Sequence, residues 1–273
     1  GDLDLIFVTV SELGARYFER SASGRVVERT VSPFHEIGEL DTVAFADIDG
    51  DGDMDLLGPG VSGFRFGRRE LDDTTLWART DSPLLPSPTS GEYGLDPIAV
   101  DWDGDGSMEL VVNSGKPTDG GLASTITLLR RDGTDGRLRP PPVNPFLPYL
   151  DPIAPFVRAL PTDWTGDGQA DLIVVKVEDF ELRFLFFERV INSTGDMLVQ
   201  RFGPENPVGN ITTPCCFAAL VAVDWNGDGL KDLIVGTSDG FMYFERMPDG
   251  TLEDRTEGGE FESLPAVAGW SWE

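Results

Sequence analysis

The chain has 273 residues, 40% of them hydrophobic, and its 48 acidic residues against 21 basic ones give a formal net charge of −27. This hydrophobic content, with 17 Phe and 6 Trp, is typical of a globular protein and excludes a disordered chain. The sequence shows neither a basic face for nucleic acid nor a run of about 18 apolar residues, so we expect no nucleic acid partner and no direct membrane insertion.

Nine-residue acidic loops recur four times along the chain. They begin at Asp47, Asp101, Asp163 and Asp224 and share the pattern D-x-[DNT]-G-D-G-x-x-[DE]. Oxygen-bearing side chains stand at loop positions 1, 3, 5 and 9, and glycines at positions 4 and 6 let the backbone turn tightly. Calcium prefers about six to eight oxygen ligands, so the loops predict four Ca²⁺ sites.

Short apolar runs surround every loop. In the fourth unit they are 221–223 before the loop, 233–235 after it and 241–244 further on, followed by a turn at Asp249 and Gly250. Runs of this length, rich in β-branched and aromatic residues, predict strands, and four short strands per repeat predict β-propeller blades. An EF-hand is disfavoured because the closing acid stands at position 9 and not 12, and because strands flank the loop. The intact blades are expected at roughly 41–82, 95–140, 157–203 and 218–256.

One stretch carries a family resemblance. Residues 224–236, with 241–244 and 249–252 after them, resemble the FG-GAP/VCBS repeat, a family of calcium-binding propellers that includes integrin α heads and some fungal lectins. The resemblance covers essentially the whole chain. It implies that each loop joins the first two strands of a blade and that its metal is structural.

The same resemblance implies a ligand set for each loop: the side chains at positions 1, 3, 5 and 9 and the backbone carbonyl at position 7. These residues are Asp47, Asp49, Asp51, Asp53 and Asp55 in loop 1; Asp101, Asp103, Asp105, Ser107 and Glu109 in loop 2; Asp163, Thr165, Asp167, Gln169 and Asp171 in loop 3; and Asp224, Asn226, Asp228, Leu230 and Asp232 in loop 4. Thr165 departs from the acid or amide norm, so loop 3 is expected to be the weakest of the four.

The two ends of the sequence align with one further repeat. Residues 266–273 align with 222–228, allowing a one-residue slip, and residues 1–6 align with 52–57. We therefore expect an all-β, five-bladed propeller of four-stranded antiparallel blades, its fifth blade built from 264–273 plus 1–32. The split calcium site at Glu273 and Asp4 lacks acids at positions 1 and 3 and is expected to be weak or empty.

Two arrangements of the fifth blade stay open. Residues 1–273 form one domain that closes its own ring, or they are one period of a longer tandem array. The array is favoured because the break falls inside a loop with no residue missing or duplicated.

Other features bear on location and contacts. Asn192 and Asn210 begin glycosylation sequons. Cys215 and Cys216 are neighbours and form either a vicinal disulfide or a pair of reduced thiols. The Trp at position 2 of loops 2 to 4 is expected to pack between blades and not to bind sugar. The proline-rich segment 137–158 is either a contact surface or a rigid connector.

No catalytic constellation is visible, and the single His35 disfavours a histidine-based site. We expect no catalytic residues and no cofactor other than Ca²⁺. The first expectation is a secreted, extracellular or cell-surface structural or adhesive glycoprotein that builds a surface assembly or filament with copies of itself or other surface and matrix proteins. The alternative is a carbohydrate- or protein-binding recognition domain, and a polysaccharide-active enzyme is a third reading.

Overall fold

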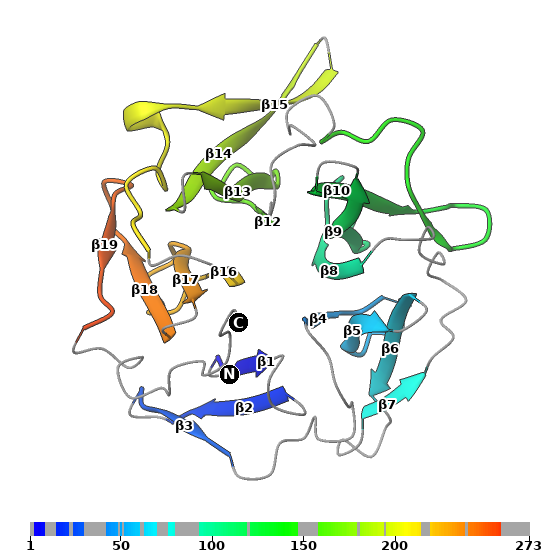
Figure 1. Cartoon of the computed structure of the whole chain (residues 1–273), viewed down its shortest axis with the longest axis horizontal. Coiled ribbons are helices and arrows are strands. Elements are labelled where there is room, and N and C mark those ends of the chain that lie inside the picture. The colour runs from blue at the N-terminus through cyan, green and yellow to red at the C-terminus, as the bar shows by residue number, and fades with distance from the viewer. Residues whose placement is uncertain are drawn as a thin grey trace.

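Antiparallel sheets surround a common centre in the computed structural model of the chain (Figure 1). The structure describes residues 3–8, 15–21, 24–29, 42–48, 50, 52–60, 63–69, 76–79, 93–118, 121–146, 158–178, 181–193, 195–213, 219–237 and 240–257. Within this part of the chain no helix is long and apolar enough to cross a membrane.

Four of the sheets have four strands each, and consecutive strands are neighbours in every one. The first is β4 (Ala44–Ala46), β5 (Asp55–Gly60), β6 (Gly63–Arg69) and β7 (Leu76–Arg79). The second is β8 (Tyr93–Val100), β9 (Glu109–Thr118), β10 (Gly121–Arg131) and β11 (Leu138–Arg139). The third is β12 (Arg158–Thr162), β13 (Asp171–Glu178), β14 (Glu181–Asn192) and β15 (Gly195–Arg201), followed by a short 3-10 helix η1 (Gly203–Glu205). The fourth is β16 (Ala219–Val223), β17 (Asp232–Thr237), β18 (Gly240–Arg246) and β19 (Leu252–Asp254).

The first strand of each four-stranded sheet, β4, β8, β12 or β16, lies nearest the centre of the ring, and later strands lie progressively further out (Figure 1). This is the radial arrangement of a β-propeller. The predictions of an all-β chain and of a propeller are confirmed.

The N-terminal sheet has three strands in the described residues: β1 (Leu5–Val8), β2 (Ala15–Arg20) and β3 (Val26–Glu28). Its register pairs Leu5 with Phe18, as β13 pairs Leu172 with Phe187, so β1 occupies the place of a second strand. The described residues therefore form four four-stranded blades and one three-stranded sheet, not the five four-stranded blades predicted. The innermost strand predicted for the fifth, within 264–273, lies outside the described residues.

The core lies between adjacent sheets. Successive residues of a strand point to opposite faces, so β13 contributes to two interfaces. Leu172 packs in a cluster with Trp102 of the second blade, whereas Ile173 packs in a cluster with Trp164 and residues of the fourth blade. A further cluster joins the fourth blade to the N-terminal sheet: Leu5, Phe18, Val26, Trp225, Ile234 and Tyr243. The N-terminal sheet thus packs beside the fourth blade as one blade packs beside the next.

Candidate calcium loops and the contacts that join them

Each acidic loop connects the first strand of a blade to the second. In loop 3, the carboxylate of Asp163 holds the loop backbone: Oδ1 accepts hydrogen bonds from the N–H of Gly166 at 2.8 Å and of Asp167 at 3.1 Å, and Oδ2 accepts one from Gly168 at 3.1 Å. Gly166 and Gly168 have φ angles of +78° and +85°, a region that other residues rarely adopt. The position 1 acids of the other three loops accept hydrogen bonds from both of their loop glycines in the same way.

The position 9 acid of each loop is buried. Asp55, Asp171 and Asp232 are 0% exposed and Glu109 is 2% exposed. In loop 3, Asp171 Oδ2 accepts hydrogen bonds from the N–H of Trp164 and of Thr165, both at 3.0 Å. Burial raises the pKa of Asp171 and of Glu109, because the charged carboxylate is removed from water. A bound cation would offset this cost.

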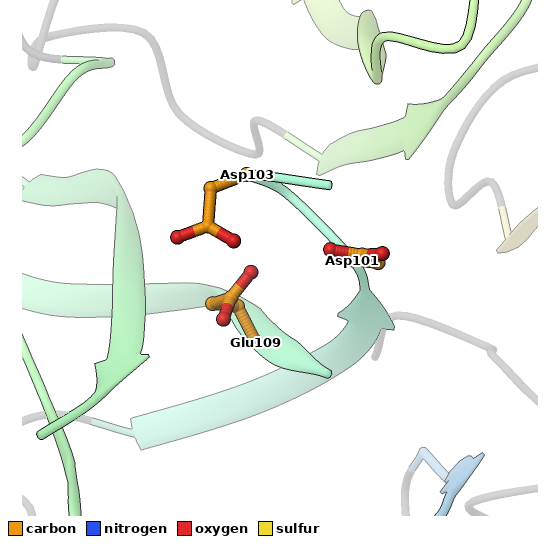
Figure 2. Close-up of side chains that lie close together, drawn as sticks. All are labelled: Asp101, Asp103 and Glu109. Atoms are coloured by element: carbon orange, nitrogen blue, oxygen red, sulfur yellow. The ribbon is translucent and has the colours of Figure 1, made fainter. Parts of the chain in front are cut away.

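Loop 2 brings three predicted ligands together. Asp101, Asp103 and Glu109 each offer a carboxylate oxygen, and the three oxygens lie within 4.8 Å of one another. Figure 2 shows the three groups gathered around one space. In the described part of the chain, no other three acidic, His or Cys residues approach this closely. The donor set and its spacing fit a hard cation such as Ca²⁺.

The other loops differ from loop 2 in the residues available. Asp49 and Asp51 of loop 1 lie outside the described residues. Loops 3 and 4 carry Thr165 and Asn226 at position 3 in place of a third closely placed acid.

Position 5 and position 7 are linked by a backbone contact in three loops. The exposed carboxylates of Asp105, Asp167 and Asp228 accept hydrogen bonds of 2.7–2.8 Å from the N–H groups of Ser107, Gln169 and Leu230. Asp53, at position 7 of loop 1, is exposed. The predicted ligand role of the position 7 carbonyls stays a prediction.

A third-strand side chain beside the loop, which no sequence motif marks, gives loops 2 and 4 different charge environments. In blade 2 this residue is Arg130, whose guanidinium pairs with Asp103. In blade 4 it is Glu245, whose Oε1 accepts a hydrogen bond from Asn226 Nδ2 at 3.0 Å. The positively charged Arg130 guanidinium therefore lies beside loop 2, whereas the additional carboxylate of Glu245 lies beside loop 4.

Arginines also connect four of the five described sheets to the loop of the preceding one, and we call Arg20, Arg131, Arg189 and Arg246 the bridging arginines. Arg246 lies 4.8 Å from the ring centroid of Trp164 and donates a 2.6 Å hydrogen bond from Nη1 to the Trp164 carbonyl. Arg189 makes the same two contacts with Trp102 at the preceding interface. Stacking of a guanidinium on an aromatic face is attractive, most strongly when water is excluded.

The contact repeats at two further interfaces. Arg20 of the N-terminal sheet lies 4.5 Å from the Trp225 ring and donates to its carbonyl at 2.7 Å. Arg131 donates to the carbonyl of Ile48, which replaces Trp at position 2 of loop 1. The Trp residues of loops 2 to 4 are 2–4% exposed, which confirms that they pack between blades. The recurring Phe-Glu-Arg at 18–20, 187–189 and 244–246 is the sequence signal that could have revealed three of these arginines; Arg131 stands outside it, in Leu-Arg-Arg.

In the N-terminal sheet, Asp4 is the equivalent of the position 9 acid of the four loops. Its Oδ1 accepts from the N–H of Arg20 at 3.0 Å and its Oδ2 from the Tyr17 hydroxyl at 2.6 Å. Asp232 makes the equivalent bonds with Arg246 and Tyr243 at 2.9 and 2.8 Å. The hydrogen bond to Asp4 raises the pKa of Tyr17 to about 12. These contacts agree with the predicted alignment of Asp4, while its predicted partner Glu273 lies outside the described residues.

The segments that follow the second and third blades are anchored in their described parts. Asn144 donates from Nδ2 to the Ile126 carbonyl at 2.6 Å, and Phe146 is 0% exposed with its ring 5.2 Å from Trp102 in an edge-to-face pair. Asn206 repeats the anchor on Phe184 of the next blade at 3.0 Å. Residues 140–146 therefore favour the connector reading of the proline-rich segment.

Of two other predicted features, the glycosylation sequons begin within the described residues and the cysteine pair lies outside them. Asn192, at the β14–β15 turn, and Asn210 are both exposed, as a glycosylated residue must be. Cys215 and Cys216 lie outside the described residues, so their redox state stays a prediction.

Comparisons with known proteins leave the family open. No family model matches the chain, and no curated protein matches it. One similar solved structure is described as the specific recognition of non-reducing terminal N-acetylglucosamine by an Agrocybe aegerita lectin. The match has 15% identity and a TM-score of 0.39, and it covers 93% of this chain and 75% of that one. Similarity at this level carries no argument about function, and the FG-GAP/VCBS relation stays a resemblance.

Proposed function

We propose that the chain is a calcium-stabilised β-propeller that serves as a non-enzymatic structural or adhesive module outside the cell or at its surface. The observation that carries the proposal is the group formed by Asp101, Asp103 and Glu109, together with the buried position 9 acid of every loop. The buried position 9 carboxylates are costly without a counter-charge, and a bound Ca²⁺ would supply that charge. The sequence resemblance to calcium-binding propellers supports the same conclusion.

Calcium would act here through folding. A cation that binds only the folded chain stabilises it by about 2.7 kcal/mol per site when its concentration is 100 times the dissociation constant. We expect the melting temperature to rise in millimolar Ca²⁺ and to fall in excess chelator, with Mg²⁺ as the control cation. A melting curve that does not change with chelator would contradict the metal assignment.

The module would associate through its fifth blade. In the described residues β1 pairs only with β2, although the equivalent strands β5, β9, β13 and β17 each have an inner neighbour as well. We propose that residues 264–269, from the same chain or from a neighbouring copy, form that inner strand and close the sheet edge. Pairing between copies would produce an assembly without any other ligand.

Two measurements distinguish a self-assembling structural module from a carbohydrate-binding domain. Light scattering and electron microscopy in Ca²⁺ should show ordered self-association, and a glycan array should show no selective binding. A selective glycan with a monomeric chain would favour the carbohydrate-binding alternative. That alternative would need residues other than Trp102, Trp164 and Trp225, because a buried indole offers no face to a sugar.

A further inference from the structure

A chain of hydrogen bonds joins the calcium loops of neighbouring blades. It starts at Asp232, the position 9 acid of loop 4, whose Oδ1 accepts from the backbone N–H of Arg246 at 2.9 Å. The guanidinium of the same Arg246 donates to the carbonyl of Trp164, at position 2 of loop 3. The N–H of Trp164 then donates to Asp171, the position 9 acid of loop 3. Two residues, Arg246 and Trp164, therefore connect two predicted calcium ligands of different loops.

The same path continues in both directions. Asp171 Oδ1 accepts from the N–H of Arg189 at 2.9 Å, Arg189 donates to the Trp102 carbonyl, and the N–H of Trp102 donates to Glu109 Oε2 at 2.8 Å. On the other side, Asp4 Oδ1 accepts from the N–H of Arg20 at 3.0 Å, and the Arg20 guanidinium donates to the Trp225 carbonyl at 2.7 Å. The N–H of Trp225 then donates to Asp232 at 3.1 Å. The path thus runs without a break from Asp4 through the position 9 acids of loops 4, 3 and 2.

We infer that the bridging arginines are positioning residues that make calcium binding at adjacent loops cooperative. The inference rests on the proposed calcium binding. A cation held by Asp232 fixes that carboxylate, and with it the backbone of Arg246. The Arg246 side chain then holds Trp164 by its ring and its carbonyl, and the N–H of the same residue orients Asp171 for the next cation. Energetic coupling of this kind requires a physical element that both sites bias, and Trp164 in its loop is that element.

The geometry explains why arginine is suited to this role. The planar guanidinium stacks on the Trp164 ring while one N–H reaches the carbonyl of the same residue, so both contacts fix one residue. Lysine has no planar group to stack and would hold Trp164 less firmly. Arg189 is 5% exposed and also pairs with Asp196 through two hydrogen bonds of 2.7–2.9 Å, which restrains its side chain further.

A site-resolved calcium titration tests the inference. In ¹⁵N-labelled protein, the amide signals of Gly106, Gly168 and Gly229 report on loops 2, 3 and 4 separately, since each glycine binds its own position 1 carboxylate. Disabling loop 4 by Asp228→Asn should weaken calcium binding at loop 3 about fivefold, the lower end of typical coupling between sites. The effect at loop 2 should be smaller, because it lies one arginine further away.

The arginine itself is then removed. In Arg246→Met, loop 3 should bind calcium with the same affinity whether or not loop 4 is disabled, and Arg246→Lys, which keeps the charge, should retain part of the effect. Arg183→Met is the control for lost positive charge, since Arg183 is exposed and pairs with Glu178 and Glu181. It should leave the coupling unchanged.

The outcomes separate the two proposals. If no glycine signal of the unmodified protein responds to calcium, both the calcium function and the coupling are wrong. If the signals respond but loop 3 binds calcium equally well with loop 4 intact or disabled, calcium binding stands and the coupling is overturned. If the coupling survives in Arg246→Met, it exists but does not pass through the bridging arginine, and the inference is overturned as well.

Discussion

The left-handed backbone of the acidic loops makes a quantitative prediction for Gly168→Ala. Gly168 has φ of +85°, and a methyl group added there would meet no heavy atom within 4 Å. The cost is therefore that of the backbone alone, about 1–2 kcal/mol for a residue with a Cβ. Gly133→Ala is the matched control, because its added methyl also meets nothing within 4 Å and its φ lies outside the positive region. Both substitutions reduce the entropy of the unfolded chain, a gain of about 0.4–1 kcal/mol that cancels in the comparison.

The assay is urea unfolding followed by Trp fluorescence in excess chelator, so that metal affinity does not enter. Gly168→Ala should be less stable than Gly133→Ala by about 1–2 kcal/mol. The same pair in saturating Ca²⁺ should show an equal or larger difference, because the strained loop also holds its cation less well. Equal stability of the two variants in chelator would refute the left-handed loop and, with it, the ligand geometry built upon it.

Three further predictions follow from single side chains. Phe146→Ala should lower the free energy of unfolding by about 3–5 kcal/mol because that ring is 0% exposed, whereas Phe202→Ala, at 67% exposure, should change it by less than about 0.5 kcal/mol in chemical denaturation. Arg130→Gln should tighten calcium binding at loop 2 about two- to fivefold, because the competing partner of Asp103 is gone; weaker binding by calorimetry would refute this. In chelator, the free energy of unfolding should fall as the pH rises from 4.5 through the raised pKa of Glu109, because the folded state binds the carboxyl proton of Glu109 more tightly than the unfolded state does. In Glu109→Gln, which has no such proton, the free energy of unfolding should depend less steeply on pH.

The loops and strands could be predicted because their information is local. The residues that shape loop 3 lie within nine positions of one another, and the glycines at 166 and 168 mark its turns directly. The apolar runs beside the loops likewise indicate strands without knowledge of their partners. The four blades follow from the repetition of this unit.

The contacts between blades could not be predicted in the same way. Arg246 and Trp164 are 82 residues apart, and Arg20 and Trp225 are 205 apart, so only the folded ring brings them together. The opposite charges of Arg130 and Glu245 beside their loops also depend on the register of the third strand, which the sequence pattern does not determine. These long-range contacts are what distinguish the individual loops.

The bridging arginines give four interfaces of the described chain the same direction. At each of these a sheet reaches back to the loop of the one before it, as Arg246 does to Trp164 and Arg189 to Trp102. Such head-to-tail contacts place different surfaces against each other, and the rotation between units decides whether they close into a ring and at what size. A duplicated unit that carried its own arginine and its own loop would find matching neighbours on both sides. Propellers of this kind could therefore gain blades by duplication, or lose them by deletion, while the chemistry of each interface stayed the same.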